Sequence, residues 1–309
     1  MIFLFLYQSC GDQANSNDDS ALDVPYVPTP MAVAAEIFRL AAIKQGDVLL
    51  DLGCGDGRIP ITAALQYGIK GYGVDLNPER IRESRENAKE AGVEHLVEFY
   101  EQDLYETDLT KASVITLYLL PSVNLKLRPK ILKETKPGTR IISHDFNMSE
   151  WSPDKDSMVF ADEETHVVYY WIVPANLTGE WTLELSDSSL KVKISFNQVF
   201  QFAQGKVVPE KKDWKITEEI LQGDKISFTL MTPKYDWSFR GSVQGDSMSG
   251  YAERGISGKI ILWDAVRDPD TKKPLEITSG SQETKTPEYC SDYSNAKRIN
   301  QLNSNPKGF

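Results

Sequence analysis

The sequence predicts an α/β protein, in which a mostly parallel sheet with helices on both faces is followed by a small antiparallel β-domain. From Val48 to Ser143, short apolar runs alternate with helical stretches, and alternating strand and helix units form parallel sheets. After about residue 175 the pattern changes to short runs separated by turn signals such as Gln222-Gly223-Asp224. That second pattern is typical of an antiparallel sandwich or barrel.

Each element of the first part follows from its local pattern. We expect Thr29 to cap a helix that begins at Pro30 and ends at about Ile43. The expected strands, the fourth of them apolar throughout, are Val48–Leu52, Gly71–Leu76, Val97–Tyr100, Ser113–Leu119 and Thr139–Ser143. The expected helices are Arg58–Tyr67, a helix capped at Asn77-Pro78-Glu79 that ends before Gly92, and a helical stretch broken at Pro129.

The second part is expected to be a meander of short strands. They are predicted at Trp181–Leu185, Lys191–Phe196, Phe200–Phe202, Lys215–Glu219, Ile226–Met231, Ser238–Val243 and Ile260–Trp263. Trp263 is expected to fill the core of this β-domain, with Arg267 stacked over it. The predicted division is an apolar segment and tether (1–23), an α/β domain (24–175), a β-domain (176–268) and a disordered tail (269–309).

Charge and cysteine content narrow the function. The chain has 34 Lys and Arg against 45 Asp and Glu, a net charge of -11, which argues against a nucleic-acid partner. An acidic surface is compatible with a cationic target such as a lysine side chain. The cysteines are Cys10, Cys54 and Cys290, far apart and without the short paired spacings of zinc sites. We therefore predict no metal site.

The apolar start of the chain leaves two expectations open. Residues 1–10 are too short to span a bilayer, which takes about 20 residues, and they lack a basic start. Ser9-Cys10-Gly11, followed by a polar tether, is similar to the end of a bacterial lipoprotein signal, although Tyr7 and Gln8 depart from that pattern. The protein is therefore expected to be either cytoplasmic or membrane-anchored through a lipid on Cys10.

The segment Asp51-Leu52-Gly53-Cys54-Gly55-Asp56-Gly57 lies between a predicted strand and a predicted helix. Gly53 and Gly55 allow the backbone to turn sharply and to approach a ligand closely. The dinucleotide pattern G-x-G-x-x-G serves a pyrophosphate, whereas here an acid precedes G-x-G-x-G. S-adenosylmethionine has no phosphate, and its amino-acid end and sulfonium cation favour a nearby carboxylate. We expect this cofactor to be bound by Asp51, Gly53, Cys54 and Gly55; the alternative is a glycine turn without a ligand.

Two further acidic positions follow the next strands. Asp75 ends the second strand, where a carboxylate can accept hydrogen bonds from both ribose hydroxyls, and Leu76 would pack on the adenine. Asp103, in Gln102-Asp103-Leu104 after the third strand, can accept a hydrogen bond from the adenine amino group, with Leu104 beside it. The alternatives are a helix cap for Asp75, a role that Asn77 already offers, and a surface loop acid for Asp103.

Four segments together resemble one family, the mitochondrial lysine methyltransferases that modify the ATP synthase c-subunit or the adenine nucleotide translocase, with their bacterial relatives. The segments are Tyr26-Val27-Pro28-Thr29, Asp51–Arg58, Tyr118-Leu119-Leu120-Pro121 and Ser143-His144-Asp145-Phe146. The resemblance covers residues 24 to about 150. It implies a Rossmann-like class I methyltransferase sheet in residues 24–175, and it adds Tyr26 and Thr29 to the cofactor site. This sequence departs from the family at Cys54, where a serine or alanine is common. The mitochondrial enzymes also lack the β-domain, so their protein substrates cannot be inferred for this chain.

The leading expectation is methyl transfer to a protein lysine amine. Tyr118, after the fourth strand, would offer its ring face to the ammonium group, and Asp145, after the fifth, would orient the incoming amine. A core aromatic and a loop cap are the alternative roles of these two residues. Two other functions stay open: a small-molecule methyltransferase with the β-domain as a lid, and a non-catalytic exported module that binds a ligand or partner. The expected partners are a protein lysine or a small molecule, with no nucleic acid and with membrane association through the N-terminus.

Overall fold

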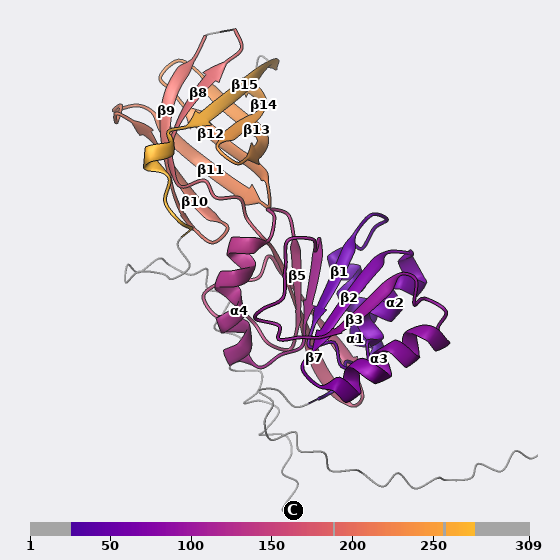
Figure 1. Cartoon of the computed structure of the whole chain (residues 1–309). Coiled ribbons are helices and arrows are strands. Elements are labelled where there is room, and N and C mark those ends of the chain that lie inside the picture. The colour runs from indigo at the N-terminus through magenta and orange to yellow at the C-terminus, as the bar shows by residue number, and fades with distance from the viewer. Residues whose placement is uncertain (1–25, 188, 256–257, 276–309) are drawn as a thin grey trace, which may run out of the picture. The chain divides into compact units, whose positions relative to one another are not determined.

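The computed structural model describes residues 26–187, 189–255 and 258–275, and this part of the chain forms two separate sheets (Figure 1). The first has seven strands in the order β3-β2-β1-β4-β5-β7-β6, and the second has eight in the order β10-β9-β8-β15-β14-β13-β12-β11. Residues 1–25 and 276–309 lie outside the described residues, and so do the predicted lipid anchor and most of the predicted tail. No helix in the described ranges has the length and apolar character needed to cross a membrane.

The first five strands of the seven-stranded sheet are parallel, as the sequence predicts. They are β1 (Val48–Leu52), β2 (Lys70–Asp75), β3 (Val97–Glu101), β4 (Val114–Leu117) and β5 (Arg140–His144). The sequence does not predict the hairpin of β6 (Lys155–Ala161) and β7 (Glu164–Ile172), whose second strand pairs antiparallel with β5. This hairpin extends the sheet on the side of β5.

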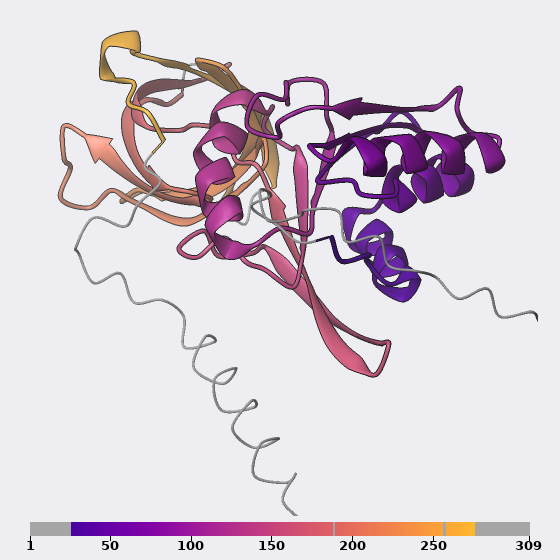
Figure 2. The same cartoon turned by 60° about the horizontal axis from the view of Figure 1, so that its bottom comes forward.

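Helices cover both faces of the seven-stranded sheet, which confirms the predicted fold class (Figure 2). They are α1 (Met31–Ala41), α2 (Arg58–Tyr67), α3 (Pro78–Glu90) and α4 (Pro121–Glu134). Successive residues of a strand point to opposite faces. Accordingly Leu49 packs in a cluster with side chains of α1 and α2, whereas Leu50 packs in a cluster with side chains of α4.

Two helix starts and one proline inside a helix test the local predictions. Asn77 caps α3 as predicted, because its side chain accepts a hydrogen bond from the Glu79 N–H at 2.9 Å. The predicted Thr29 cap is wrong: the cap position of α1 is Pro30, and the Thr29 hydroxyl bonds to His144 instead. The predicted break at Pro129 is also wrong, since α4 continues through it. Burial of apolar α4 side chains outweighs the one backbone hydrogen bond that proline removes.

Every paired strand of the second sheet is antiparallel to its neighbours. The strands are β8 (Gly179–Leu185), β9 (Lys191–Val199), β10 (Phe202–Val208), β11 (Lys215–Gln222), β12 (Lys225–Met231), β13 (Asp236–Gln244), β14 (Ser247–Arg254) and β15 (Lys259–Arg267). The edge strands β10 and β11 also lie against each other, and the Gly205 N–H donates to Glu219 Oε1 at 2.9 Å. The sheet is therefore nearly closed, which favours the barrel over the sandwich.

The β-domain prediction needs correction at three points, the first of which is that β14 (Ser247–Arg254) has no predicted counterpart. The strand predicted at Phe200–Phe202 is wrong because Phe200, with φ of 51°, lies in the turn between β9 and β10. Trp263 is buried as predicted, but Arg267 stacks over Trp181, with its guanidinium carbon 4.4 Å from the ring centroid. The reason is the register, since Arg267 lies directly opposite Trp181 in the β15–β8 pair.

The chain continues past residue 268 with a short 3-10 helix, Pro269–Thr271, in which the Thr271 hydroxyl accepts a hydrogen bond from the Glu180 N–H at 2.8 Å. The domain boundary near residue 175 remains a prediction, which limited proteolysis would test.

Candidate functional site

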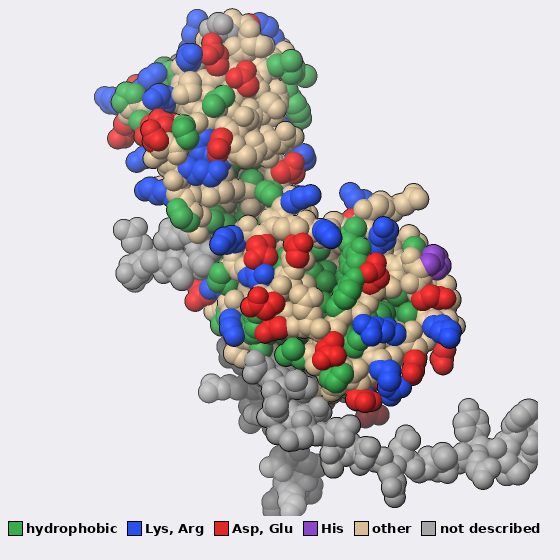
Figure 3. All heavy atoms as spheres, in the orientation of Figure 1, with side chains coloured by type: hydrophobic (Ala, Val, Ile, Leu, Met, Phe, Trp, Pro, Cys, Tyr) green, Lys and Arg blue, Asp and Glu red, His purple; other side chains and the backbone are tan. Residues whose placement is uncertain are grey.

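A cavity lies at the carboxyl ends of β1, β2, β3 and β4, the edge at which parallel sheets present loops to ligands. All ten residues that the sequence predicts to bind the cofactor line this cavity: Tyr26, Thr29, Asp51, Gly53, Cys54, Gly55, Asp75, Leu76, Asp103 and Leu104. Tyr118 lines it too, and Asp145 does not. Figure 3 shows one face of the α/β part of the chain, on which hydrophobic side chains gather along a hollow that charged side chains of both signs flank.

The glycine loop after β1 has a left-handed backbone shape, which glycine adopts most readily. Gly53, Gly55 and Gly57 have φ values of 81°, 51° and 78°, in the left-handed region. The N–H groups of Gly53 and Cys54 both donate to the Val74 carbonyl at 2.9 Å, which fixes the loop to β2. A side chain at Gly55 would overlap the Tyr26 ring, so Tyr26 covers the loop directly.

Asp75 connects the end of β2 to this loop. Its Oδ2 accepts a hydrogen bond from the Gly55 N–H at 3.0 Å, and its Oδ1 accepts one from the Asn77 N–H at 2.9 Å. A carboxylate oxygen has more than one acceptor site, so both oxygens keep capacity for ribose hydroxyls. The predicted ribose contact is thus compatible with a second task, which is to hold the Gly55 turn.

Asp51 is the most buried acid of the cavity, with 6% of its surface exposed. Its Oδ1 accepts a hydrogen bond from the Thr116 hydroxyl at 2.6 Å. Burial above all, together with the nearby charges of Asp75 and Asp56, raises the pKa of Asp51 to about 7, although the hydrogen bond from Thr116 acts to lower it. Burial likewise raises the pKa of the Cys54 thiol, so this cysteine is a neutral wall residue.

An arginine that the sequence analysis left unassigned holds segment 26–29 over the loop. Arg58 makes a 2.6 Å ion pair with Asp56 and donates to the Thr29 carbonyl at 2.9 Å. The guanidinium carbon of Arg80 lies 4.6 Å from the centroid of the Tyr26 ring. Arg58 is the residue directly after the glycine motif, and this position could have indicated its role from the sequence. No sequence pattern indicates the role of Arg80.

Leu76 and Asp103, which the sequence predicts to contact the adenine, both line the cavity. Leu76 is 51% exposed although it is aliphatic. Asp103 Oδ1 accepts a hydrogen bond from the Tyr105 N–H at 2.8 Å, which leaves Oδ2 available to a ligand donor. An exposed leucine beside an available carboxylate suits a flat ring with an amino group.

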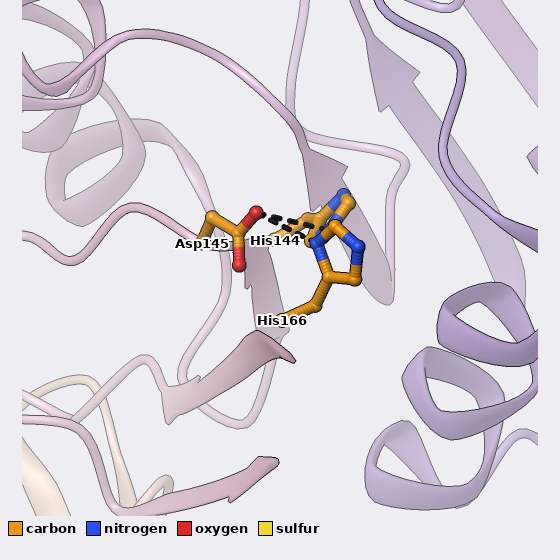
Figure 4. Close-up of side chains that lie close together, drawn as sticks. All are labelled: His144, Asp145 and His166. Carbon is orange, nitrogen blue, oxygen red and sulfur yellow. Dashed lines mark hydrogen bonds and ion pairs between the residues drawn. The ribbon is translucent and has the colours of Figure 1, made fainter. Parts of the chain in front are cut away.

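Tyr118 and Asp145, the two predicted catalytic residues, have different surroundings. The Tyr118 ring lies against His144 at an interplanar angle of 32°, with centroids 3.8 Å apart, and stacks on Phe146. Burial raises the Tyr118 pKa. Asp145 follows β5 and faces β7: Oδ1 accepts the Val167 N–H at 2.8 Å, and Oδ2 lies 2.9 Å from His166 Nδ1 (Figure 4). Burial lowers the pKa of His144 to about 4. The structure thus brings Tyr118, and not Asp145, to the cofactor cavity.

Comparisons with known proteins identify the methyltransferases that this chain is similar to. Residues 51–155 match the ANTKMT methyltransferase domain family. Over 151 residues the chain is 42% identical to the protein-lysine N-methyltransferase of Saccharolobus islandicus, covering 48% of this chain and 94% of that protein. It is 31% identical over 131 residues to the human lysine N-methyltransferase of the ATP synthase c-subunit, with 42% of this chain and 55% of that one covered. The chain therefore spans only about half the length of this human relative.

A solved structure is also similar. The RNA methyltransferase from Salinibacter ruber, in complex with S-adenosyl-L-homocysteine, is 48% identical, with 48% of this chain and 94% of that chain covered and a TM-score of 0.46.

Proposed function

This chain belongs to the methyltransferase family of these protein-lysine enzymes, and we propose that it transfers the methyl group of S-adenosylmethionine to a lysine amine of a protein. The observation that carries the proposal is the match to the Saccharolobus protein-lysine methyltransferase, 42% identical and covered over 94% of its length. Family membership confirms the resemblance drawn from the motifs and favours an enzyme over a non-catalytic binding module. A small-molecule acceptor has no comparable support.

The residues of the cavity fit each part of the cofactor. S-adenosylmethionine supplies a methyl group on a positively charged sulfur. Asp51 offers a buried carboxylate to the cationic end, and the glycine loop lets the ligand approach the backbone closely. Asp75 accepts hydrogen bonds from the ribose hydroxyls, and Asp103 accepts from the adenine amino group beside Leu76.

Tyr118 is the residue that we place next to the acceptor. It lines the cavity, and its ring is held between contacts to His144, with centroids 3.8 Å apart, and to Phe146, with centroids 6.2 Å apart. The part of Tyr118 that lines the cavity is where we place the lysine ammonium. A free lysine has a pKa of about 10.4 and must lose a proton before its nitrogen can attack. Desolvation and the positive sulfonium both lower the pKa of the bound amine, so the rate should rise with pH until that amine is neutral.

The test uses the full chain with radiolabelled S-adenosylmethionine and a cell lysate separated into protein, nucleic-acid and small-molecule fractions. We expect label in protein, with mass spectrometry locating methyl groups on lysine nitrogen. Asp75→Ala should abolish labelling, and the exposed Asp108→Ala should not. Label confined to RNA or to a metabolite would overturn the lysine acceptor. Absence of cofactor binding would overturn the whole assignment.

The cellular location is a separate proposal that rests on residues outside the described range. We propose that modification of Cys10 decides between a cytoplasmic and a membrane-anchored protein. Mass spectrometry of the mature N-terminal peptide from membrane and soluble fractions would distinguish the two. A lipid on Cys10 supports the anchor, and an unprocessed Met1 in the soluble fraction refutes it.

A further inference from the structure

Three side chains with metal-binding atoms meet where β5 ends beside β7. His144 is the last residue of β5, Asp145 follows it, and His166 lies on β7, which pairs antiparallel with β5 (Figure 4). His144 Nε2 lies 3.0 Å from His166 Nδ1 and 3.3 Å from Asp145 Oδ2, and the latter two atoms are 2.9 Å apart. The chain has 3 histidines in all, and two of them are in this cluster.

While Asp145 is ionised, hydrogen bonds alone do not satisfy all three contacts of this triangle of atoms. Each ring nitrogen carries at most one hydrogen, and a carboxylate oxygen is an acceptor. If His166 Nδ1–H donates to Asp145, the lone pair of His144 Nε2 faces the same carboxylate oxygen. If both facing nitrogens carry hydrogens, the two N–H groups oppose each other at 3.0 Å. With an ionised Asp145, each of these arrangements therefore leaves one contact between two donors or two acceptors, whereas a single cation among the three atoms attracts all of them.

The distances suit a transition-metal ion. Ligand atoms about 2.0–2.1 Å from one ion, at angles of about 90–110°, lie roughly 2.9–3.4 Å from each other, and the three measured separations are 2.9, 3.0 and 3.3 Å. Imidazole nitrogen with one carboxylate is a donor set for zinc or iron(II) rather than for magnesium or calcium, which prefer oxygen alone.

The outer contacts also match those of metal ligands. A coordinating histidine usually bonds through its second ring nitrogen to an oxygen, and His144 Nδ1 lies 3.2 Å from the Thr29 hydroxyl. A coordinating carboxylate is usually hydrogen-bonded through its other oxygen, and Asp145 Oδ1 accepts the Val167 N–H. Both histidines are buried and the Asp145 side chain is 26% exposed, so water or a small ligand can reach the ion on one side.

We propose that His144 Nε2, His166 Nδ1 and Asp145 Oδ2 bind one divalent transition-metal ion. The ion lies behind the wall of the cofactor cavity, because Thr29 bonds to His144, Tyr118 lies against it, and both residues line the cavity. Bound metal fixes the His144 ring and thereby positions Tyr118. The inference does not depend on the identity of the methyl acceptor.

The test is calorimetric titration of the metal-free full chain with Zn²⁺. We expect about one ion per chain and a loss of affinity of roughly a hundredfold or more in His166→Ala and in Asp145→Asn. The exposed histidine provides the matched control: His95→Ala removes an imidazole outside the cluster and should bind Zn²⁺ like the wild type. Thr29→Ala, which removes only the outer contact, should weaken binding roughly tenfold to a hundredfold.

Cobalt(II) gives a second readout that unfolding cannot mimic. The wild type should develop visible ligand-field absorption with Co²⁺, and His166→Ala should not, while S-adenosylhomocysteine binding shows that the variant is folded. A folded wild type that binds neither ion overturns the proposal, even where a variant fails to fold. Equal Zn²⁺ affinity in His166→Ala and the wild type overturns it as well.

Discussion

Replacing Asp51 with asparagine tests whether this buried carboxylate recognises the cationic end of the cofactor. Asp51 is 6% exposed, accepts a hydrogen bond from Thr116, and has a pKa raised by burial to about 7. A positive group placed beside such a carboxyl favours its ionised form. The α-ammonium of S-adenosylhomocysteine is such a group, so binding should return the Asp51 pKa towards its ordinary value of 3.8 and release a proton.

This linkage has a definite sign. The ligand-free protein keeps the Asp51 proton up to a pH of about 7, so affinity should rise with pH and then level off once Asp51 is ionised. Binding at pH 6 should be about tenfold weaker than at pH 8. Without ligand, the free energy of unfolding should fall as pH rises from about 4 to about 7, because the unfolded chain has already lost the proton that folded Asp51 keeps.

The assay is titration calorimetry with S-adenosylhomocysteine at several pH values, in buffers of different ionisation enthalpy. The wild type should release close to one proton at pH 6. Asp51→Asn should bind about tenfold to a hundredfold more weakly at pH 8 and lose the pH dependence. The exposed Asp108→Asn, with the same loss of charge, should behave like the wild type. A flat wild-type affinity from pH 6 to 8, or the same slope in Asp51→Asn, would refute the reasoning.

Three further experiments distinguish residues that bind cofactor or substrate from residues that stabilise the fold. Gly55→Ala and its control Gly46→Ala both place a side chain at positive φ, which costs about 1–2 kcal/mol of folding free energy. Only at Gly55 does the new atom meet Tyr26, so calorimetry should show weaker cofactor binding for Gly55→Ala alone. Tyr118→Ala should raise the KM for a lysine peptide roughly tenfold, whereas Tyr118→Phe keeps the ring face and should change it little; equal effects would contradict the assignment. Arg267→Met should lower the free energy of unfolding in urea by about 3 kcal/mol, because it leaves the Thr178 and Gly245 carbonyls without a donor, and should leave cofactor affinity unchanged.

The parallel half of the first sheet was predictable because its signals are local. Each strand from β1 to β5 is a short apolar run beside a helix with its own start or stop signal, and the observed bounds differ from the predicted ones by at most two residues. The β6–β7 hairpin breaks the strand–helix alternation and was therefore missed. Its edge strand β6 exposes Met158 and Phe160 at 61% and 74%, and its other face is only partly buried, with Val159 and Ala161 packed against the core. The run Val167–Ile172 did carry a usable signal, since it is rich in β-branched and aromatic residues.

The cofactor residues and the histidine cluster differ in the same way, since only the cofactor residues have local signals in the sequence. Eight of the ten predicted cofactor residues lie at or just after the ends of β1, β2 and β3, whose carboxyl ends meet at one edge by geometry alone. Tyr26 and Thr29 precede the first strand and were indicated only by the family resemblance. His166 comes to His144 through the antiparallel pairing of β5 with β7, in which His144 lies opposite Val168. His144 and His166 are 22 residues apart in the sequence, and no motif spacing indicates that they meet. The histidine cluster could therefore not be predicted without the hairpin.

The backbone conformation of Asp145 allows Asp145→Asn to test the function of the carboxylate without disturbing the turn. Asp145 has a φ of 59°, a left-handed conformation that asparagine tolerates as well as aspartate. Asp145→Asn therefore keeps the turn and can keep the hydrogen bond from the Val167 N–H, while it removes the charge. Loss of Zn²⁺ binding with an unchanged KM for the lysine peptide would place Asp145 with the metal ion. A raised KM with unchanged Zn²⁺ binding would instead place the carboxylate beside the incoming amine, as the sequence first suggests. Cofactor affinity should stay constant in both cases, because Asp145 lies outside the cavity.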